Sequence, residues 1–378
     1  MRVMHVIDGL YGGGAETSLL EVAPALADRG VKTSIVALKE DDGGLEDRLR
    51  MVGIAPVRLK HRNPASLALE LRNVIRSEQP DLLHTTLMWS NLVGRIAARA
   101  ARTPVVTTLA NRDYGPEHRG NSRYGPWGVR AVYSAEVVTG PLTACFHAVS
   151  EDVATIMSRR LKIPTDQIKV VYRGRDTSRM GSATLNRRLR VRAALSISAT
   201  TPLVLSVGRL DRQKGVETTI VAFQHLVADV PDAVLLLAGR PGNASALAEA
   251  LAQDTPGIRL LGHRTDIPDL MCAADVLSFP SRWEGLPGTL IEAMAMRLGI
   301  VASDIPPVVE VLGNVNWPLV PPDNPLVLAS GLASVLRGGA VNDAQRSAGE
   351  KRFRALFTAE AASEGMVKLY QDVLQRAH

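Results

Sequence analysis

Short runs of β-branched and apolar residues alternate with segments of helical spacing along all 378 residues of the chain. Strands are expected in two series: in the first half at 2–7, 32–38, 55–60, 81–86, 104–109, 146–150 and 169–174, and in the second half at 203–208, 233–239, 258–262, 276–281, 299–304 and 316–320. Helices are expected between them, for example at 14–29, 66–78, 91–102, 216–229 and 244–253. Strands that alternate with helices indicate parallel sheets covered on both faces. The sequence therefore predicts an α/β protein with two doubly wound, Rossmann-like domains.

The boundary between these domains is expected between residues 175 and 200. The segment 173–195 is polar, strongly basic and free of strand pattern, which is typical of a linker and a short helix. The length also suits two domains, because single cores stop growing beyond about 250–300 residues. We predict a first domain over 1–178, a second over 199–355 and a helical tail over 344–376.

Composition excludes several classes of protein. Hydrophobic residues make up 46% of the chain, and no apolar run approaches the ~18 residues that a membrane-spanning helix needs. The N-terminal residues lack the apolar segment and cleavage site of a signal peptide, so a cytoplasmic location is expected. The two cysteines, Cys145 and Cys272, lie in apolar surroundings without metal-ligand spacing, which favours buried thiols.

The net charge of +6 lies entirely in the first half of the chain. Residues 1–180 hold 25 Lys and Arg against 19 Asp and Glu, a difference of +6, whereas residues 181–378 hold 19 of each. This asymmetry favours an anionic partner for the first half, either a phospholipid surface or a phosphate-bearing acceptor. Nucleic acid is disfavoured, because aromatic residues make up only 4% and do not alternate with the basic ones.

A glycine-rich turn, Gly12 to Gly14, follows the first expected strand and precedes a helix that begins near Glu16. Glycines let the backbone approach a ligand, and the free N–H groups at a helix start attract an anion. The turn carries neither the G-x-G-x-x-G dinucleotide fingerprint nor the Lys-Ser/Thr ending of a P-loop. It fits an anion-binding turn and a plain tight turn equally well.

Arg209 and Lys214 follow the first expected strand of the second half, in the sequence VGRLDRQKG. The carboxyl ends of parallel strands face the ligand crevice of such sheets. Two cations at that edge, in front of a helix, are typical of a diphosphate clamp.

Two glutamates, Glu284 and Glu292, flank a Gly-Leu-Pro-Gly turn and the start of a helix expected over 289–297. A carboxylate accepts paired hydrogen bonds from neighbouring hydroxyls, and both a ribose and a hexose offer such pairs. A helix-start acid that stabilises the helix dipole would explain Glu292 alone, but not the turn glycines or the tryptophan beside Glu284. We therefore favour a site that holds both ends of a sugar nucleotide.

Together these motifs resemble those of the glycosyltransferases of family 4, the retaining, sugar-nucleotide-dependent group with the GT-B fold. The resemblance covers nearly the whole chain. It rests on the E-x7-E run with EGLPGTLIEAMA, on the following GIVASDIPPVVEVL, on VGRLDRQKG and on GGGAE. It implies two Rossmann-like domains that face a central cleft, with a tail helix over about 356–378 packed back on the first domain.

The resemblance also implies roles for individual residues. Arg209 and Lys214 would neutralise the departing diphosphate, Glu284 would hold the donor sugar, and Glu292 would hold the ribose hydroxyls. The other donor-binding residues that it implies are Gly12, Gly13, Gly14, Gly208, His263, Arg264, Gly285, Leu286, Pro287, Gly288 and Thr289.

The first half departs from the family pattern in two places. Ala110 and Asn111 stand where many members have a histidine after the fifth strand, and RGRD replaces the common NGVD at 173–176. The replacement for that histidine stays open among Asn111, Arg112, Asp113 and Tyr114. His147 is a further acceptor-side candidate, although a structural role is favoured for it and for His84.

The sequence thus predicts a retaining glycosyltransferase that uses a UDP-sugar first, or a GDP-sugar second. The acceptor would be a glycan, a lipid-linked precursor or a natural product. Peripheral contact of the protein with the inner face of an anionic membrane is a further expectation. No cofactor or metal is expected, because the chain has no Asp-x-Asp pair to bridge a metal to the diphosphate. A sugar-nucleotide epimerase of the same fold and a non-enzymatic nucleic-acid binder are the alternatives.

Overall fold

The structure, a computed structural model, describes residues 1–11, 13–39, 45–115, 125–338 and 341–377. The chain divides into two compact units, which are described separately below. Unit 1 comprises Met1–Asp176 and Leu356–His378, and unit 2 comprises Thr177–Ala355. These divisions fall next to positions 178 and 355, where the sequence analysis ended its two domains.

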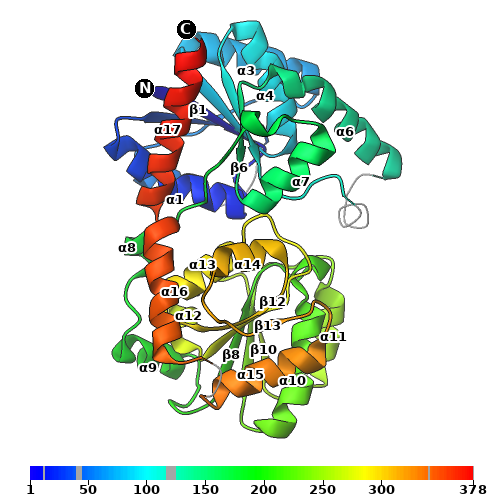
Figure 1. Ribbon diagram of the computed structural model, residues 1–378, viewed down its shortest axis with the longest axis vertical. Coiled ribbons are helices and arrows are strands. Elements are labelled where there is room, and N and C mark those ends of the chain that lie inside the picture. Colours follow the sequence, from blue (N-terminus) through cyan, green and yellow to red (C-terminus); the bar gives the residue numbers. More distant parts are fainter. Residues whose placement is uncertain (12, 40–44, 116–124, 339–340, 378) are drawn as a thin grey trace. The chain divides into compact units, whose positions relative to one another are not determined.

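Unit 1 contains a parallel sheet of seven strands in the order β3-β2-β1-β4-β5-β6-β7. Its strands are β1 (Arg2–Ile7), β2 (Lys32–Ala37), β3 (Val57–Arg58), β4 (Leu82–Thr86), β5 (Val105–Leu109), β6 (Cys145–Ala148) and β7 (Ile168–Val170). Its helices are α1 (Gly14–Asp28), α2 (Leu45–Met51), α3 (Pro64–Glu78), α4 (Met88–Ala101), α6 (Pro126–Thr139), α7 (Glu151–Leu161) and α17 (Ala359–Ala377), with short 3-10 turns η1 (Gly140–Leu142) and η2 (Thr165–Gln167). Figure 1 shows the helices around the sheet, with α17 in red.

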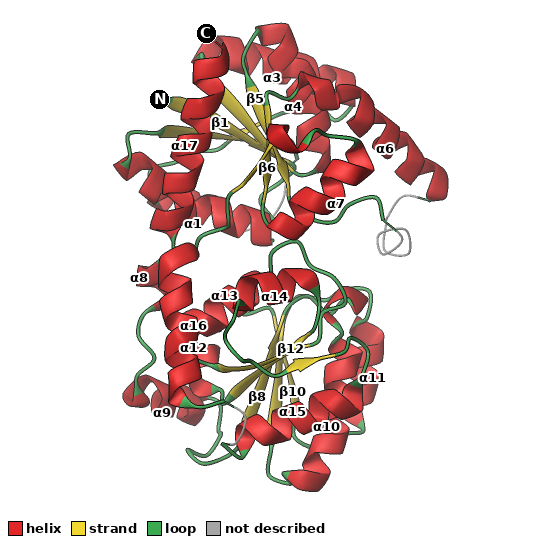
Figure 2. Ribbon diagram, in the orientation of Figure 1, coloured by secondary structure: helices red, strands yellow, loops and turns green. Residues whose placement is uncertain are grey.

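Unit 2 contains a parallel sheet of six strands in the order β10-β9-β8-β11-β12-β13. Its strands are β8 (Leu203–Val207), β9 (Val234–Ala238), β10 (Ile258–Gly262), β11 (Val276–Phe279), β12 (Gly299–Ser303) and β13 (Leu319–Val320). Its helices are α8 (Thr177–Met180), α9 (Leu185–Ala194), η3 (Arg212–Lys214), α10 (Val216–Asp229), α11 (Ser245–Gln253), α12 (Ile267–Ala273), α13 (Gly288–Ala295), α14 (Pro306–Leu312), α15 (Pro325–Leu336) and α16 (Asp343–Leu356). In each unit the strands lie inside and the helices outside (Figure 2).

The strands form because their residues are apolar on both faces, as a sheet covered on both sides requires. In β1, β5 and β12 nearly every side chain is buried. One face of the unit 1 sheet packs against α1 and α17, through a core that includes Val3, Leu82, Val106, Leu369 and Tyr370. All the expected strands and the α/β class are confirmed.

The short helix expected in the basic segment is confirmed as α9, but from Thr177 onward the segment is part of unit 2 rather than a linker. Arg188 and Arg192 on α9 form ion pairs with Asp275, at 2.5 and 2.9 Å. Both arginines also donate to the carbonyl of Ala273 at the end of α12, where a helix leaves carbonyls unpaired. The linker expectation was wrong here, because these charges have partners some eighty residues away along the chain.

The helical tail is interrupted rather than continuous. Arg175 donates its backbone N–H to the Phe357 carbonyl at 2.8 Å, and its own carbonyl accepts from the Ala359 N–H at 2.9 Å. A Cβ on Gly174 would lie 2.4 Å from the Thr358 carbonyl oxygen, so only glycine permits this approach. The pairing replaces helical hydrogen bonds and separates α16 from α17.

Both cysteines are free and buried, as predicted. Within the described ranges, no helix is both long and apolar enough to cross a membrane.

Candidate functional site

The order of strands in unit 2 reverses between β8 and β11. Ligands of open α/β sheets bind outside the carboxyl ends of the strands at such a switch point. The loops that leave β8 and β11 there are 208–215 and 280–287. They carry Arg209, Lys214 and Glu284, so the residues predicted from motifs converge on the position that the topology favours.

Close backbone approaches explain the glycines of these loops. Gly215 has a φ of +63°, and a Cβ on it would lie 2.4 Å from the Pro280 carbonyl oxygen. Gly208 has a φ of +154°, and a Cβ on the neighbouring Gly239 would lie 1.7 Å from the Gly208 carbonyl oxygen. Larger residues would push the loops apart, so these glycines set the shape of the crevice.

An ion pair joins the two loops across the switch point. Lys214 Nζ lies 2.6 Å from Glu284 Oε1, and the Glu284 side chain is 6% exposed. Two further hydrogen bonds fasten the same loops: Gln213 Nε2 donates to the Trp283 carbonyl at 2.9 Å, and Arg282 N–H donates to the Gln213 carbonyl at 2.8 Å. The sequence analysis gave Lys214 and Glu284 separate tasks and missed that they bind each other.

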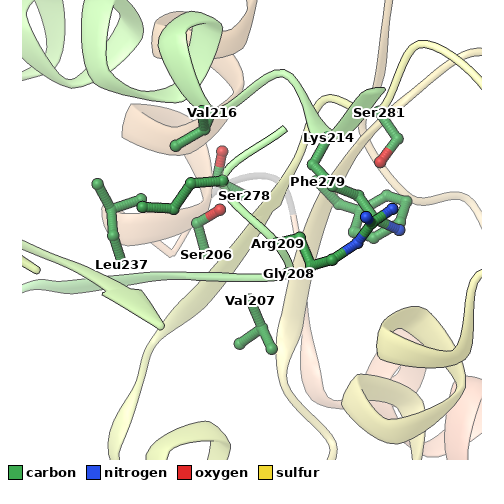
Figure 3. A pocket seen from close by; sticks show the side chains of 11 residues that line it. Ser206, Val207, Gly208, Arg209, Lys214, Val216, Leu237, Ser278, Phe279 and Ser281 are labelled. Atoms are coloured by element: carbon green, nitrogen blue, oxygen red, sulfur yellow. The ribbon is translucent and has the colours of Figure 1, made fainter. Parts of the chain in front are cut away.

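Arg209 is an exposed cation of this edge, with 62% of its side chain accessible. Its guanidinium lies 2.9 Å from the buried Asp211 carboxylate, which also accepts from the Asn243 backbone N–H at 2.9 Å. Arg209 and Lys214 line one small pocket with Ser206, Gly208 and Ser278 (Figure 3). The Asp211 carboxylate therefore holds the Arg209 guanidinium in place, while most of the side chain stays accessible to a ligand.

The predicted helix after Glu284 is α13, which begins at Gly288 rather than Thr289. Gly285, Leu286 and Pro287 form the turn that leads into it, and Glu292 lies buried in its second turn. The N–H groups at the start of a helix lack partners within it and attract anions. Glu292 and the turn thus belong to the same β11–α13 connection as Glu284.

His263 and Arg264 follow β10, at the far edge of the sheet from β11. Arg264 pairs with Asp266 at 2.6 Å, and His263 Nε2 lies 3.4 Å from Arg240 Nη2. Partial burial, followed by the Arg240 charge, lowers the pKa of His263. This environment favours the neutral form of the ring.

In unit 1 the strand order reverses between β1 and β4. Asp8, which directly follows β1, connects the ends of these two strands. Its carboxylate accepts from the backbone N–H of Ser90 at 2.7 Å and of Trp89 at 3.3 Å, in the first turn of α4. Burial raises the pKa of Asp8, and these hydrogen bonds oppose the rise. The sequence analysis missed Asp8, whose signal was its position directly after β1.

The glycine-rich turn follows Asp8. Gly12 lies outside the described residues. Gly13 precedes α1, and a Cβ on it would lie 2.6 Å from Glu16 Oε2, while Gly14 is the first residue of the helix. The Glu16 carboxylate thus lies against Gly13, whereas a Cβ on Gly14 would make only an ordinary contact, 3.6 Å from Arg173 Nη1.

The acceptor-side candidates of unit 1 are mostly engaged in internal contacts. Arg112 donates twice to Asp152, at 2.5 and 2.6 Å, and Tyr114 packs edge-on against Tyr133 with ring centroids 5.8 Å apart. Burial, and then the nearby Glu136 carboxylate, raises the pKa of Tyr114. In the structure both side chains therefore have internal partners, and an acceptor role for Arg112 or Tyr114 stays a prediction.

Asn111 and Asp113 are held by their neighbours in a fixed loop. Arg160 Nη1 donates to the carbonyls of Arg112 and Asp113, at 2.7 and 2.8 Å. Asn111 Oδ1 accepts from the Arg112 N–H at 2.9 Å, and its side chain lies partly exposed after β5. Of the four candidates in this loop, Asn111 and Asp113 remain able to meet a ligand.

His147 is buried in a hydrogen-bond chain and does not reach an acceptor, which corrects that part of the expectation. His147 Nε2 lies 2.9 Å from the Val171 carbonyl, so this nitrogen carries the proton and donates. Its Nδ1 then accepts from Thr108, whose hydroxyl accepts from His84 Nε2 at 2.8 Å. His84 Nδ1 in turn accepts from the Tyr370 hydroxyl on α17 at 2.7 Å.

His5 lies beside this chain, with its ring centroid 5.0 Å from that of His84. Burial lowers the pKa of His5 to about 4, and likewise that of His147. Burial and the neighbouring histidines lower the pKa of His84 well below its ordinary value. The three rings are therefore neutral structural groups, as the sequence analysis favoured for His84 and His147.

Two family models match the chain in succession. The model described as Glycosyltransferase Family 4 matches residues 12–179, and the model described as Glycosyl transferases group 1 matches residues 201–338. Together they span more than half of the chain.

Curated relatives carry the same kind of name. The D-inositol 3-phosphate glycosyltransferase of Xylanimonas cellulosilytica is 27% identical over 96% of this chain and 93% of its own length. The UDP-Gal:alpha-D-GlcNAc-diphosphoundecaprenol alpha-1,3-galactosyltransferase of Escherichia coli is 26% identical over 63% of this chain, but the match spans only 61% of that protein.

Among solved structures, HepE from Anabaena in complex with UDP-glucose aligns with a TM-score of 0.84, covering 98% of this chain and all of that one. At 20% identity this likeness shows the fold alone, which is GT-B. With both family models matched in order and the fold in agreement, the chain belongs to the group 1, family 4 glycosyltransferases.

Proposed function

We propose that this glycosyltransferase transfers a sugar from a nucleoside-diphosphate sugar, bound at the switch point of unit 2. The observation that carries the proposal is the Lys214–Glu284 ion pair between the β8 and β11 loops, with the exposed Arg209 in the same pocket. A sugar diphosphate offers hydroxyls for a carboxylate and anionic oxygens for two cations, which matches this set of groups.

Donor binding would exchange the partners of this ion pair. Lys214 and Arg209 would bind the diphosphate, and Glu284 would accept hydrogen bonds from hydroxyls of the sugar. The exchange gives each charged group a new hydrogen-bond partner, so that no buried charge is left without one. Glu292 would hold the ribose hydroxyls, and the backbone N–H groups of 285–289 would contribute further donors.

In the proposed reaction, the bond between the anomeric carbon and the diphosphate oxygen breaks, and the diphosphate leaves with the electron pair. The acceptor oxygen bonds to the same face of that carbon, so the configuration is retained, and its proton passes to the departing phosphate. Cations and backbone donors aimed at the growing charge contribute about 3 kcal/mol each in a dry site. On this proposal, Arg209 and Lys214 serve in place of a divalent metal.

The names of similar proteins support a choice of substrates. The Escherichia coli relative is named for UDP-Gal and a diphosphoundecaprenol acceptor, and HepE was crystallised with UDP-glucose. We therefore propose a UDP-sugar before a GDP-sugar, and a lipid-linked glycan before a small natural product. The predicted roles of Gly13, Gly14, His263 and Arg264 toward the donor also remain proposals.

The test is a thermal-shift panel with UDP, GDP, ADP, TDP and NAD, each in EDTA. Stabilisation by UDP that persists in EDTA, and that Lys214→Ala greatly reduces, is the expected result. Stabilisation by NAD alone, by none of the nucleotides, or only after Mg²⁺ is restored would contradict the metal-free donor site.

Two alternatives predict different outcomes. An epimerase would convert the sugar nucleotide without an acceptor, and a nucleic-acid binder would bind DNA or RNA with strong salt dependence. Family membership favours transfer over both. An increase in acceptor mass by one sugar residue, with equimolar release of nucleoside diphosphate, separates transfer from both alternatives.

A further inference from the structure

Arg282 precedes Glu284 by two residues in the β11 loop, and its guanidinium binds groups from two other connections of unit 2. Nη1 lies 2.8 Å from Glu217 Oε1, in the first turn of α10, and Nη2 lies 2.5 Å from Asp323 Oδ1, between β13 and α15. Nη1 also donates to the carbonyl of Arg212 in η3. One side chain therefore joins the connections that leave β8, β11 and β13 at the carboxyl edge of the sheet.

These contacts lie next to the donor site proposed above. Arg212 precedes Lys214 by two residues, as Arg282 precedes Glu284. Ser281, the neighbour of Arg282, lines the same pocket as Lys214 (Figure 3). The separation of the two loops at Arg282 thus sets how far Lys214 lies from the Glu284 carboxylate.

Glu217 needs Arg282 as a partner. Both side chains are only 18% exposed, so solvent screens their charges less than those of an open surface pair. Glu217 Oε2 is buried and has no hydrogen-bond partner among the described residues, which leaves the Arg282 contact at Oε1 to compensate the charge. The planar guanidinium reaches its three acceptors in fixed directions, so the loops that it joins are held in one arrangement.

We propose that Arg282 is a positioning residue for sugar transfer, which holds the β8 and β11 loops at the separation that Lys214 and Glu284 need to bind the donor. Its action is indirect, because two carboxylates and a carbonyl already occupy its guanidinium. The inference rests on the proposed function and adds to it the residue that fixes the geometry of the site. Loops that are fixed beforehand do not have to be ordered when the donor binds, which raises the affinity.

The test is calorimetric titration of the full chain with UDP in EDTA, because UDP carries the charge of the departed diphosphate. Arg282→Gln should weaken UDP binding about tenfold, since loops that are no longer held must be ordered on binding. Arg297→Gln is the matched control, because Arg297 also pairs with two carboxylates of unit 2, those of Asp343 and Glu350, but follows the end of α13 rather than its start. Arg297→Gln should bind UDP like the unchanged chain, and equal UDP affinity in Arg282→Gln would overturn the proposal.

A further variant separates position from charge. Arg282→Gln alone removes a positive charge near an anionic ligand and leaves Glu217 unpaired. Adding Glu217→Gln restores the net charge and removes the unpaired carboxylate. UDP binding should still be about fivefold weaker than in the unchanged chain, because the contacts to Asp323 and to the Arg212 carbonyl stay lost. Recovery of full affinity would overturn the proposal in favour of a long-range effect of charge.

A double-mutant cycle tests whether Arg282 acts through Lys214. In the Lys214→Ala chain, Arg282→Gln should weaken UDP binding about twofold or less, because the group that Arg282 positions is already gone. An equal loss of affinity in both backgrounds would overturn the proposal.

Hydrogen exchange without UDP provides a readout that does not depend on the ligand. Arg282→Gln should speed exchange in residues 208–215 and 280–287, while β9 and β12 stay protected because the variant folds. If Arg282→Gln does not fold, Asp323→Asn should give the same pattern to a smaller extent, since the Asp323 side chain is 56% exposed. Unchanged exchange in both loops would overturn the inference.

The same titrations distinguish failure of this inference from failure of the proposed function. If the unchanged chain does not bind UDP, or if Lys214→Ala binds it equally well, the proposed function is overturned, and the exchange measurement alone decides whether Arg282 holds the loops. If UDP binding depends on Lys214 but not on Arg282, only this inference is overturned.

Discussion

The two units have the same kind of sheet, but different interactions join the loops at their switch points. In unit 1 Asp8 reaches from the β1 loop to the N–H groups of Trp89 and Ser90, and so caps α4. In unit 2 Lys214 reaches from the β8 loop to the Glu284 carboxylate, and on our proposal both side chains change partner when the donor binds. The same topological position is closed by a side chain that caps a helix in one unit and by an ion pair between two loops in the other.

The largest effect that would sharpen this comparison is expected from Lys214→Ala. Turnover should fall about 100-fold to 1,000-fold, because the lost cation acts on charge that grows in the transition state. The Michaelis constant for the donor should change less than turnover does. Steady-state kinetics check this, with Arg212→Ala as the control, an exposed cation in the same η3 turn. Equal turnover in the two variants would remove Lys214 from the reaction.

The second prediction concerns the stability of unit 1 at acidic pH. The pKa of His5 and of His147 is about 4 in the folded chain, below the ordinary value of 6.5. The unfolded state therefore binds more protons between these values, and stability present above pH 6.5 is lost as pH falls toward 4. Each buried ring contributes about 3 kcal/mol to this loss.

Hydrogen exchange from pH 7 to 4.5 checks this, with peptides from β1 and β6 compared with peptides from β8 and β11. The unit 1 peptides should lose protection first, because the three buried histidines lie there. Loss of protection in unit 2 at the same or a higher pH would contradict this difference between the units.

A smaller effect is expected from Asp8→Ala. Removing a carboxylate that caps a helix costs about 1–2 kcal/mol, so the free energy of unfolding of unit 1 should fall by this amount. Urea unfolding monitored by exchange in β4 and α4 measures it, and Asp166→Ala serves as a control with an exposed carboxylate. If Asp8→Ala left stability unchanged but abolished turnover, the contrast with Lys214 would fail.

The smallest effect on stability is expected from Arg112→Ala. The Arg112–Asp152 pair is bidentate but still reached by solvent, with side chains 15% and 12% exposed, so its loss should cost about 1 kcal/mol. The loop 111–115 should exchange its amide hydrogens faster, while Arg159→Ala on the exposed side of α7 should leave it unchanged. A large loss of acceptor affinity without faster exchange would instead return Arg112 to the acceptor-side candidates.

This contrast also explains what the sequence could predict. The strands and the Arg209, Lys214 and Glu284 positions follow from local patterns, because strand-end loops bring together residues that belong to short motifs. Asp152, the partner of Arg112, is 40 residues away, and Asp275, the partner of Arg192, is 83 residues away. Local patterns carry no record of such pairs, so the sequence analysis could not predict the internal partner of Arg112 or the attachment of the basic segment to unit 2.

The central claim is that the nucleotide binds at the switch point of unit 2. Hydrogen exchange with and without UDP in EDTA tests it most directly. The account predicts that UDP slows exchange in residues 208–215 and 280–292, and that Lys214→Ala weakens this protection. Protection that is absent from both loops, or that is unchanged in Lys214→Ala, would contradict it.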